Sequence, residues 1–225
     1  MKTRTLTIVY VIIGLTYLIR DQYNMFIPQT LLKALIIPVL IALLLLNLKL
    51  RDNRMHMLML AGLLFSWAGD IILDIPGSNP LFFIAGLASF LVANLMYLTV
   101  FAITPGKNFI SGKGSPLLVP VIITGIGLIS ILNNDLGAMR FPVVMYTVVI
   151  LTMLTGAMNR LLKVNRASYW MVLAGAILFI ISDSTIAINK FSHPFPQSGM
   201  VVMGTYIAAQ YLIITGYIRQ FRSPK

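Results

Sequence analysis

The sequence contains no cysteine and no glutamate, and only two histidines, His56 and His193, occur among its 225 residues. Without cysteine the chain forms no disulfides and offers no thiolate nucleophile or thiolate metal ligand. Two histidines exclude a histidine-rich zinc site, and a Ser-His-Asp triad would require His193 to fold back from a predicted loop. The sequence also has no phosphate-binding loop and no dinucleotide fingerprint. We therefore expect no cofactor and no resident metal. An oxygen-ligated Mg²⁺ or Ca²⁺ between aspartates is the alternative that the residue types leave open.

Charged residues are scarce, at 10% of the chain, whereas apolar residues make up 58% and the mean hydropathy is +0.90. This composition is typical of membrane proteins. A spanning helix needs about 20 mainly apolar residues to cross a hydrocarbon core of about 30 Å, so the chain has room for about seven to nine spans. Little remains for a soluble domain, and we expect a single integral membrane domain over residues 1–225.

The few charges are unequal in sign, because six aspartates face seventeen lysines and arginines, which gives a net charge of 17 − 6 = +11. In a soluble protein this excess would indicate a nucleic-acid partner. Here the basic residues fall in short loops and at the ends of apolar runs. We therefore expect them to set the membrane topology and to contact anionic head groups of membrane lipids, and we expect no nucleic-acid partner.

The apolar runs are bounded by charges, Pro, Gly or Asn and predict an all-α polytopic fold with eight transmembrane helices. The predicted spans are residues 5–20, 30–49, 56–75, 80–103, 115–132, 140–158, 168–188 and 199–218. The first run begins with basic residues, as a signal peptide does. It has no small-x-small cleavage site before Arg20, so we expect an uncleaved first span.

The distribution of cations predicts the orientation of these spans. With the N-terminus inside, thirteen of the seventeen cations fall in cytoplasmic segments. The four at the other face are Arg20, Lys33, Arg140 and Lys190. This bias predicts cytoplasmic N- and C-termini. We expect a multi-pass protein of a bacterial inner membrane.

The two halves of the chain carry similar polar positions. The stretch F-S-W-A-G-D ends at Asp70 and F-I-I-S-D ends at Asp183. Asn94 follows Asp70 by 24 residues, and Gln210 follows Asp183 by 27 residues. These separations favour an internal repeat of four helices plus four, with chance similarity between apolar segments as the alternative.

Three aspartates lie within or at the ends of predicted spans. A carboxylate in hydrocarbon costs several kcal/mol unless it faces protein or a wet cavity, so such residues usually mark a site. Asp70 and Asp183 lie inside their apolar runs, whereas a Pro-Gly sequence follows shortly after Asp74 and places it at a rim. Two carboxylates held close in a low dielectric divide into a neutral acid and a charged base. Asp70 and Asp74 are four residues apart and share a helix face, so they are one candidate pair. If spans three and seven are neighbours, Asp70 and Asp183 form the same kind of pair across the bundle, and we predict these two as the catalytic residues.

Other polar residues in the spans supply a cation, amides and hydroxyls around these acids. Singly, each has an ordinary role at the membrane interface or between helices. Together they lie at a depth that a lipid head group reaches. The residues predicted to bind or orient a substrate are Lys33, Asp74, Asn94, Tyr146, Ser182, Tyr206 and Gln210.

Several of these residues belong to motifs that follow one another along nearly the whole chain. The motifs are Lys33 at the start of span two, Gly69-Asp70, Phe90 through Asn94 to Tyr97, P-V-V-M-Tyr146, Ser182-Asp183 and T-Y-I-A-A-Gln210. In these motifs the sequence resembles the YhhN-like membrane proteins, which include lysoplasmalogenases. It departs from their pattern at Asn94, where many members have His, and at Ala34, where they have Pro. Asp74 also stands where relatives have an apolar residue.

The resemblance implies an integral membrane hydrolase whose substrate is a lysophospholipid. Such an enzyme cleaves the vinyl-ether bond of lysoplasmalogens to a fatty aldehyde and glycerophosphoethanolamine or glycerophosphocholine. Asp70 and Asp183 would share acid and base catalysis, Lys33 would hold the phosphate, and the other polar residues would orient water and the glycerol hydroxyl. The alternatives are a proton-coupled transporter that uses the same aspartates, a lipid-binding protein, and an enzyme of this fold that acts on a different lipid ether or ester.

Overall fold

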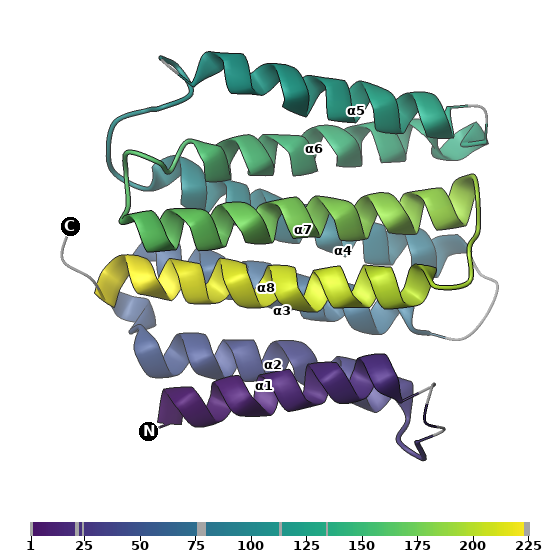
Figure 1. Cartoon of the computed structure of the whole chain (residues 1–225), viewed down its shortest axis with the longest axis horizontal. Helices are drawn as coiled ribbons and strands as arrows, with labels where there is room; N and C mark the ends of the chain where they lie inside the picture. The colour runs from purple at the N-terminus through teal and green to yellow at the C-terminus, as the bar shows by residue number, and fades with distance from the viewer. Residues whose placement is uncertain are drawn as a thin grey trace. The chain divides into compact units, whose positions relative to one another are not determined.

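The computed structural model of the chain describes residues 2–20, 23, 25–75, 80–112, 114–133 and 135–222 (Figure 1). Its α-helices are α1 (Lys2–Ile19), α2 (Gln29–Asn47), α3 (Arg54–Leu73), α4 (Pro80–Ile103), α5 (Leu118–Leu132), α6 (Arg140–Met158), α7 (Arg166–Phe191) and α8 (Ser198–Arg222). Each predicted span coincides with one of these helices, and no strand occurs in the residues just given. The all-α prediction is confirmed.

The helices have the length and composition of membrane spans. Within the described part of the chain, seven helical segments are long and apolar enough to cross a membrane. They are α2, α3, α4, α7 and α8, together with α5 and α6 when each is taken with the short helical turn before it (Ser115–Leu132 and Gly137–Met158). The apolar stretch of α1, Thr3–Ile19, is shorter than these segments, but the 18 residues of the whole helix rise about 27 Å, close to the thickness of a hydrocarbon core. The chain is therefore an integral, multi-pass membrane protein. The direction in which each span crosses, and the cytoplasmic position of the termini, stay predictions.

The last two helices extend beyond their predicted bounds. Helix α7 begins two residues early because Asn165 caps it, with its side-chain oxygen 2.9 Å from the Ser168 amide nitrogen. It continues to Phe191, and α8 continues to Arg222. Hydropathy marks where a chain leaves the hydrocarbon, whereas helical hydrogen bonding persists until a residue ends it. The two boundaries therefore differ by about one turn.

The chain divides into two compact units, Met1–Val100 and Phe101–Lys225. Helices α1 to α3 and nearly all of α4 belong to the first unit, and α5 to α8 belong to the second. This division into four helices and four agrees with the halves expected from the sequence. A structural repeat between the halves, and the single domain over residues 1–225, stay predictions.

In the first unit, two glycines of α3 lie against two aromatic rings of α4. A Cβ atom on Gly62 would lie 2.5 Å from Cε1 of Tyr97, and one on Gly69 would lie 2.7 Å from Cε2 of Phe90. Atoms do not approach so closely, so these two positions require glycine for this packing. Two of the sequence motifs are therefore in contact here, because the Phe90 ring of F-x-x-x-N-x-x-Y packs against Gly69 of G-D.

In the second unit, glycines bring α7 and α8 into backbone contact. A Cβ atom on Gly175 would lie 2.9 Å from the carbonyl oxygen of Ala209 and 3.0 Å from the amide nitrogen of Ile213. A Cβ atom on Gly216 would lie 3.1 Å from the amide nitrogen of Val172. Small residues allow such close packing of membrane helices, where dispersion contacts replace the hydrophobic effect as the driving force.

We expect Gly175→Ala to destabilise the protein, although alanine is the better helix former. The new methyl group overlaps backbone atoms of α8, which cannot move away as a side chain can by changing its rotamer. Overpacking of this kind costs about 1–3 kcal/mol. The midpoint of thermal unfolding in detergent should fall by about 2–8 °C. Gly127→Ala is the matched control, because a Cβ there has nothing within 4 Å, and its midpoint should stay equal or rise. Equal midpoints for the two variants would contradict this account of the α7–α8 contact.

Candidate functional site

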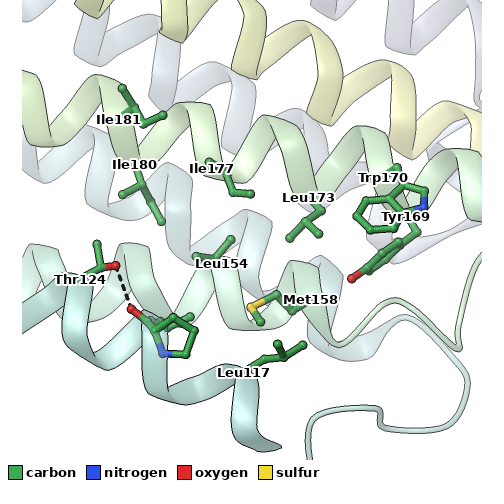
Figure 2. Close-up of a pocket in the computed structure, with 12 residues that line it drawn as sticks. Leu117, Thr124, Leu154, Met158, Tyr169, Trp170, Leu173, Ile177, Ile180 and Ile181 are labelled. Atoms are coloured by element: carbon green, nitrogen blue, oxygen red, sulfur yellow. Dashed lines mark hydrogen bonds between the residues drawn. The ribbon is translucent and has the colours of Figure 1, made fainter. Parts of the chain in front are cut away.

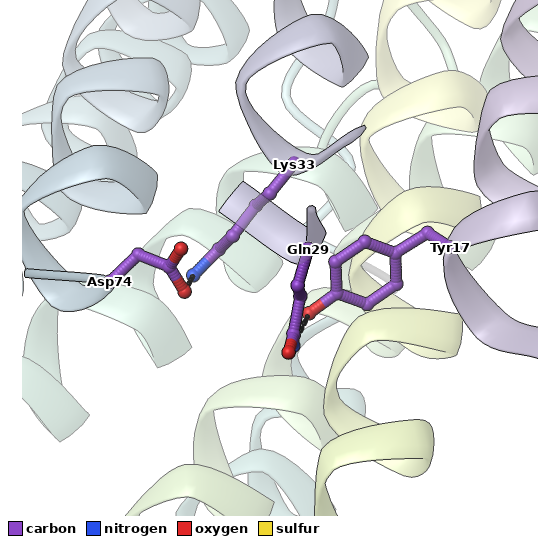
Figure 3. Close-up of polar contacts among 4 residues, drawn as sticks. All are labelled: Tyr17, Gln29, Lys33 and Asp74. Carbon is purple, nitrogen blue, oxygen red and sulfur yellow. Dashed lines mark hydrogen bonds and ion pairs between the residues drawn. The ribbon is translucent and has the colours of Figure 1, made fainter. Parts of the chain in front are cut away.

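A polar cluster lies in the first unit where α2 begins and α3 ends (Figure 3). Nζ of Lys33 lies 3.6 Å from Oδ1 of Asp74, and both side chains are largely shielded, with 13% and 20% exposed. One turn before Lys33 on α2, Nε2 of Gln29 donates a hydrogen bond of 2.6 Å to the hydroxyl of Tyr17, near the end of α1. The structure thus joins two predicted residues, Lys33 and Asp74, and adds two that the sequence did not indicate.

The two aspartates of α3 differ in position. Asp74 is the C-terminal cap of the helix, with its amide nitrogen 3.1 Å from the carbonyl oxygen of Ile71. Asp70 lies one turn earlier and is only 2% exposed, beside the glycine that receives the Phe90 ring. Asp70 is therefore the buried carboxylate of this helix, and Asp74 is the one at its end.

Two side chains near this cluster donate hydrogen bonds to backbone carbonyl groups, one between helices and one within α4. Nε1 of Trp67 on α3 donates to the carbonyl oxygen of Ala34 at 2.9 Å, directly beside Lys33. Because proline also has a carbonyl group, alanine at this position does not alter that bond. The predicted residue Asn94 is fully buried on α4 and donates from Nδ2 to the carbonyl oxygen of Phe90 at 3.0 Å. Asn94 thus lies one turn after Phe90, the residue whose ring covers Gly69.

In the second unit, the hydroxyl of Tyr146 on α6 donates a hydrogen bond to Oδ2 of Asp183 on α7. Tyr146 is 8% exposed and Asp183 is partly buried. The P-V-V-M-Y and S-D motifs, separated by 37 residues, therefore meet at a single phenol–carboxylate contact. We refer to these two residues as the Tyr146–Asp183 pair.

The other three predicted residues of the second unit are also buried. One is the neighbour of Asp183 on α7, and two are on α8. Ser182 donates from Oγ to the carbonyl oxygen of Val202 at 3.0 Å, so its hydroxyl links α7 to α8. Tyr206 packs edge-on against Phe179, with ring centroids 5.7 Å apart, and Gln210 is fully buried. Their part in substrate binding stays a prediction.

The predicted site residues thus fall into two groups, one in each unit. The first unit holds Lys33, Asp70, Asp74 and Asn94, and the second holds Tyr146, Ser182, Asp183, Tyr206 and Gln210. The pairing of Asp70 with Asp183 in one site stays a prediction. Across the described ranges, no three carboxylate or imidazole side chains gather as ligands of a metal ion would.

Two cations that the sequence assigned to lipid head groups are instead buried in the short connection between α6 and α7. Arg160 is 0% exposed and Lys163 is 7% exposed. Nη2 of Arg160 donates to Oγ of Ser168 at 3.1 Å and to Oε1 of Gln220 at 2.9 Å. Its Nε and Nη1 atoms have no hydrogen-bond partner among the residues that the structure describes. The guanidinium also lies 5.2 Å from the centroid of the Phe101 ring, a cation–π contact.

Burial lowers the pKa of Arg160 to about 10, with a smaller opposing effect from Tyr217. Burial also lowers the pKa of Lys163, and the charge of Arg160 lowers it further. Both cations therefore bind protons less tightly in the folded chain than in the unfolded chain. At neutral pH both side chains are charged, and their burial then lowers the free energy of unfolding by its full amount. This destabilisation decreases as the pH rises above their pKa values in the folded state.

We expect Lys163→Met to keep or raise the thermal unfolding midpoint at pH 7, by up to about 4 °C, because a poorly solvated charge is replaced by a side chain that packs. The variant should also show a smaller rise of the midpoint between neutral and alkaline pH than the wild type. Lys107→Met, in an exposed loop of the same unit, is the control and should leave the pH dependence unchanged. A clear fall of the midpoint in Lys163→Met at pH 7 would contradict this interpretation.

Comparison with known proteins identifies relatives of this chain. A family model described as the YhhN family matches residues 28–217. The curated relatives include lysoplasmalogenase TMEM86A of Bos taurus, 37% identical over 68% of this chain and 61% of that protein. They also include lysoplasmalogenase TMEM86B of Homo sapiens, 31% identical over 72% of this chain and 64% of that protein. The chain thus matches less than two thirds of the length of these relatives. No solved structure matches the chain significantly.

Proposed function

This chain belongs to the YhhN family, and from that premise we propose that it is a membrane hydrolase of lysoplasmalogens. Two findings support the proposal. The family match extends over most of the chain, and the curated relatives carry the name lysoplasmalogenase. We also propose the inner membrane of a bacterium as its location and a lysophospholipid with an ethanolamine or choline head group as its substrate.

The proposed reaction begins with transfer of a proton to the alkene carbon of the vinyl ether. The resulting oxocarbenium ion is attacked by water at the carbon bonded to the ether oxygen, and the water loses a proton to give a hemiacetal. The hydroxyl of the hemiacetal then loses its proton as the bond from carbon to the glycerol oxygen breaks. The glycerol oxygen takes up a proton, and the fatty aldehyde is released. The reaction consumes one water and needs one neutral carboxylic acid as proton donor. It also needs one carboxylate that stabilises the cation and accepts a proton from water, a division of labour known from glycoside hydrolysis.

The observation that carries the assignment of roles is the hydrogen bond from Tyr146 to Asp183. A hydroxyl that donates to Oδ2 favours the ionised form of Asp183 and holds the orientation of the carboxyl group. We therefore propose Asp183 as the carboxylate that stabilises the cation and accepts the proton of water, with Tyr146 as its positioning residue. Asp70, buried in α3, takes the role of the proton donor. Lys33 and the remaining polar residues bind the phosphate and orient the glycerol.

The test is an assay of the purified, full-length chain in detergent with a lysoplasmalogen, in which aldehyde release is coupled to an aldehyde dehydrogenase. The proposal predicts stoichiometric release of aldehyde and of glycerophosphoethanolamine or glycerophosphocholine. The matching 1-acyl lysophospholipid is the control substrate and should give no aldehyde. Absence of aldehyde release, together with a solute gradient across sealed vesicles that collapses with the proton gradient, would overturn the proposal in favour of transport.

A further inference from the structure

A long apolar groove lies between α5, α6 and α7 of the second unit (Figure 2). It has a volume of about 470 Å³, within the range of small-molecule pockets. Its residues are Leu117, Pro120, Val121, Thr124, Leu154, Met158, Tyr169, Trp170, Leu173, Ile177, Ile180 and Ile181. No charged side chain is among them, and the hydroxyl of Thr124 is already bonded to the carbonyl oxygen of Pro120 at 2.9 Å. The other polar side-chain atoms of these residues are the hydroxyl of Tyr169 and the indole nitrogen of Trp170, both at one end of the groove, and the rest of its surface is hydrocarbon.

The groove has a buried floor and an open side. Val121, Met158 and Ile180 are each 8% exposed, whereas Trp170 is 61% exposed and Ile177 is 45% exposed. Because α5, α6 and α7 are membrane spans, a ligand enters such an opening from the bilayer rather than from water.

Next to the groove, α5 and α6 are in close contact. A Cβ atom on Gly125 would lie 2.5 Å from Cδ1 of Leu151, so glycine lets α5 approach α6 closely. Thr124, the residue before Gly125 on α5, lines the groove.

The length of the groove matches one lipid chain. From Tyr169 to Ile181 along α7, twelve residues rise about 18 Å at 1.5 Å per residue. A hydrocarbon chain of one leaflet spans half of a core about 30 Å thick, or about 15 Å. The groove therefore accommodates a single chain over its full length, with little space for a second.

The two ends of the groove differ in chemistry. Ile180 and Ile181 form one end, and Asp183 follows Ile181 by two residues, about 3 Å along the axis of α7. Beyond that level, an apolar cluster fills the space between the same three helices. Its residues are Leu132, Leu136 and Val143, with Leu128, Met139, Ala187, Ile188 and Phe191 packed against them. Along the axis of α7 the groove therefore ends close to the level of Asp183, while Leu117, Tyr169 and Trp170 form the opposite end.

We propose that this groove holds the hydrocarbon chain of a single-chain lipid, with the first carbons at Ile180 and Ile181 and the methyl end near Leu117 and Trp170. The proposal rests on the proposed function for its direction, because the vinyl ether joins the head group to the first carbons of the chain. A chain in this position brings the reacting bond to the level of Asp183. Since the bilayer is itself apolar, the groove adds no hydrophobic driving force. It acts by positioning the bond and by selecting the length of the chain.

Photolabelling of the purified, full-length chain in detergent tests the position and direction of the lipid. The probes are two saturated 1-O-alkyl lysophosphatidylethanolamines, which have no vinyl bond to cleave, with a diazirine at the terminal carbon or near the ether oxygen. The terminal diazirine should label the Leu117, Met158 and Trp170 end, and the other should label Ile180 or Ile181. Excess unlabelled lysolipid should suppress both. Ile122 and Ile126 on α5 are more than half exposed and report on lipid that merely surrounds the protein. If they are labelled as strongly as the groove, and unlabelled lysolipid does not suppress the labelling, the probes bind only as annular lipid. That result, or reversed order of the two probes, would overturn the proposal.

Variants of Leu173, near the middle of the groove, test chain selection. With lysoplasmalogens of graded chain length, Leu173→Trp should lower kcat/KM for long chains about tenfold relative to short ones, a typical effect of pocket volume. Leu173→Ala should shift the preference toward longer chains. Ile126→Trp, outside the groove and 60% exposed, is the matched control and should leave the profile unchanged. An unchanged profile in both Leu173 variants would overturn the proposal.

These results separate the groove from the reaction. Aldehyde release with labelling scattered outside the groove would overturn the groove and leave the proposed function intact. If the two probes label the two expected ends of the groove and unlabelled lysolipid suppresses the labelling, but no lysoplasmalogen releases aldehyde, the groove is supported and the proposed function is overturned.

Discussion

The Asp183→Asn variant is expected to lose at least about 99% of its turnover of lysoplasmalogen, because general acid–base groups contribute about 10²- to 10⁴-fold to rates. Asparagine keeps the size of the side chain and retains an oxygen that accepts the hydrogen bond of Tyr146, so the contact between α6 and α7 should persist. What is lost is the negative charge that stabilises the oxocarbenium ion and accepts a proton from water. The measurements are kcat from aldehyde release and the midpoint of thermal unfolding, of which only the first should change strongly.

Two further variants separate the role of Asp183 from a general effect of charge. Asp135→Asn removes an exposed carboxylate between α5 and α6 and should leave kcat unchanged. Tyr146→Phe keeps the ring but removes the donor to Asp183, and should lower kcat by about tenfold with little change in KM, as a loss of positioning does. Full activity in Asp183→Asn would remove this residue from the mechanism.

The arrangement of spans was predictable from the sequence because hydropathy governs it. Every predicted span is a helix, and the start of α4 at Pro80 and both bounds of α6, Arg140 and Met158, are those predicted. The ends of α7 and α8 were less predictable, because the cap at Asn165 and the continued hydrogen bonding to Arg222 are backbone features that hydropathy does not record.

The candidate site was predictable only in its residue types. Aspartates in apolar runs stand out in a sequence, and so does the tyrosine of P-V-V-M-Y, but their mutual contacts depend on helix rotation. The contact of Lys33 with Asp74 and the bond from Gln29 to Tyr17 appear only in the fold. Gln29 did carry one overlooked signal, since it precedes Lys33 by four residues and shares its helix face.

The burial of Arg160 was mispredicted for a related reason. A cation in a short loop beside a span usually contacts lipid head groups. Here Ser168 and Gln220 accept its hydrogen bonds and the Phe101 ring lies beside it. These three residues lie far from one another in the sequence, so no local sequence pattern predicts that they surround Arg160. The sequence did not predict the apolar groove either, because the groove depends on how α5, α6 and α7 pack together.

Asp70→Asn is expected to reduce turnover by about 10² or more, whereas Asp74→Asn, one turn later on the same helix, should have a much smaller effect. Asp70 is nearly inaccessible at 2% exposure, and amide substitution removes its capacity to deliver a proton to the alkene carbon. Asp74 caps the helix and pairs with Lys33, so its loss should raise KM through the lysine rather than lower kcat. Kinetics of the two variants with one lysoplasmalogen provide the comparison, and thermal unfolding verifies that both are folded.

The double variant Asp70→Asn/Asp183→Asn tests whether the two carboxylates serve one reaction. If Asp70 donates the proton and Asp183 stabilises the cation that forms, the two act on a single transition state, and removing the second after the first costs little more. We expect the double variant to lose about as much activity as the more severe single variant. Losses that multiply would assign the two residues to independent roles. A more damaging Asp74→Asn than Asp70→Asn would transfer the role of proton donor from the buried carboxylate of α3 to the one at its end.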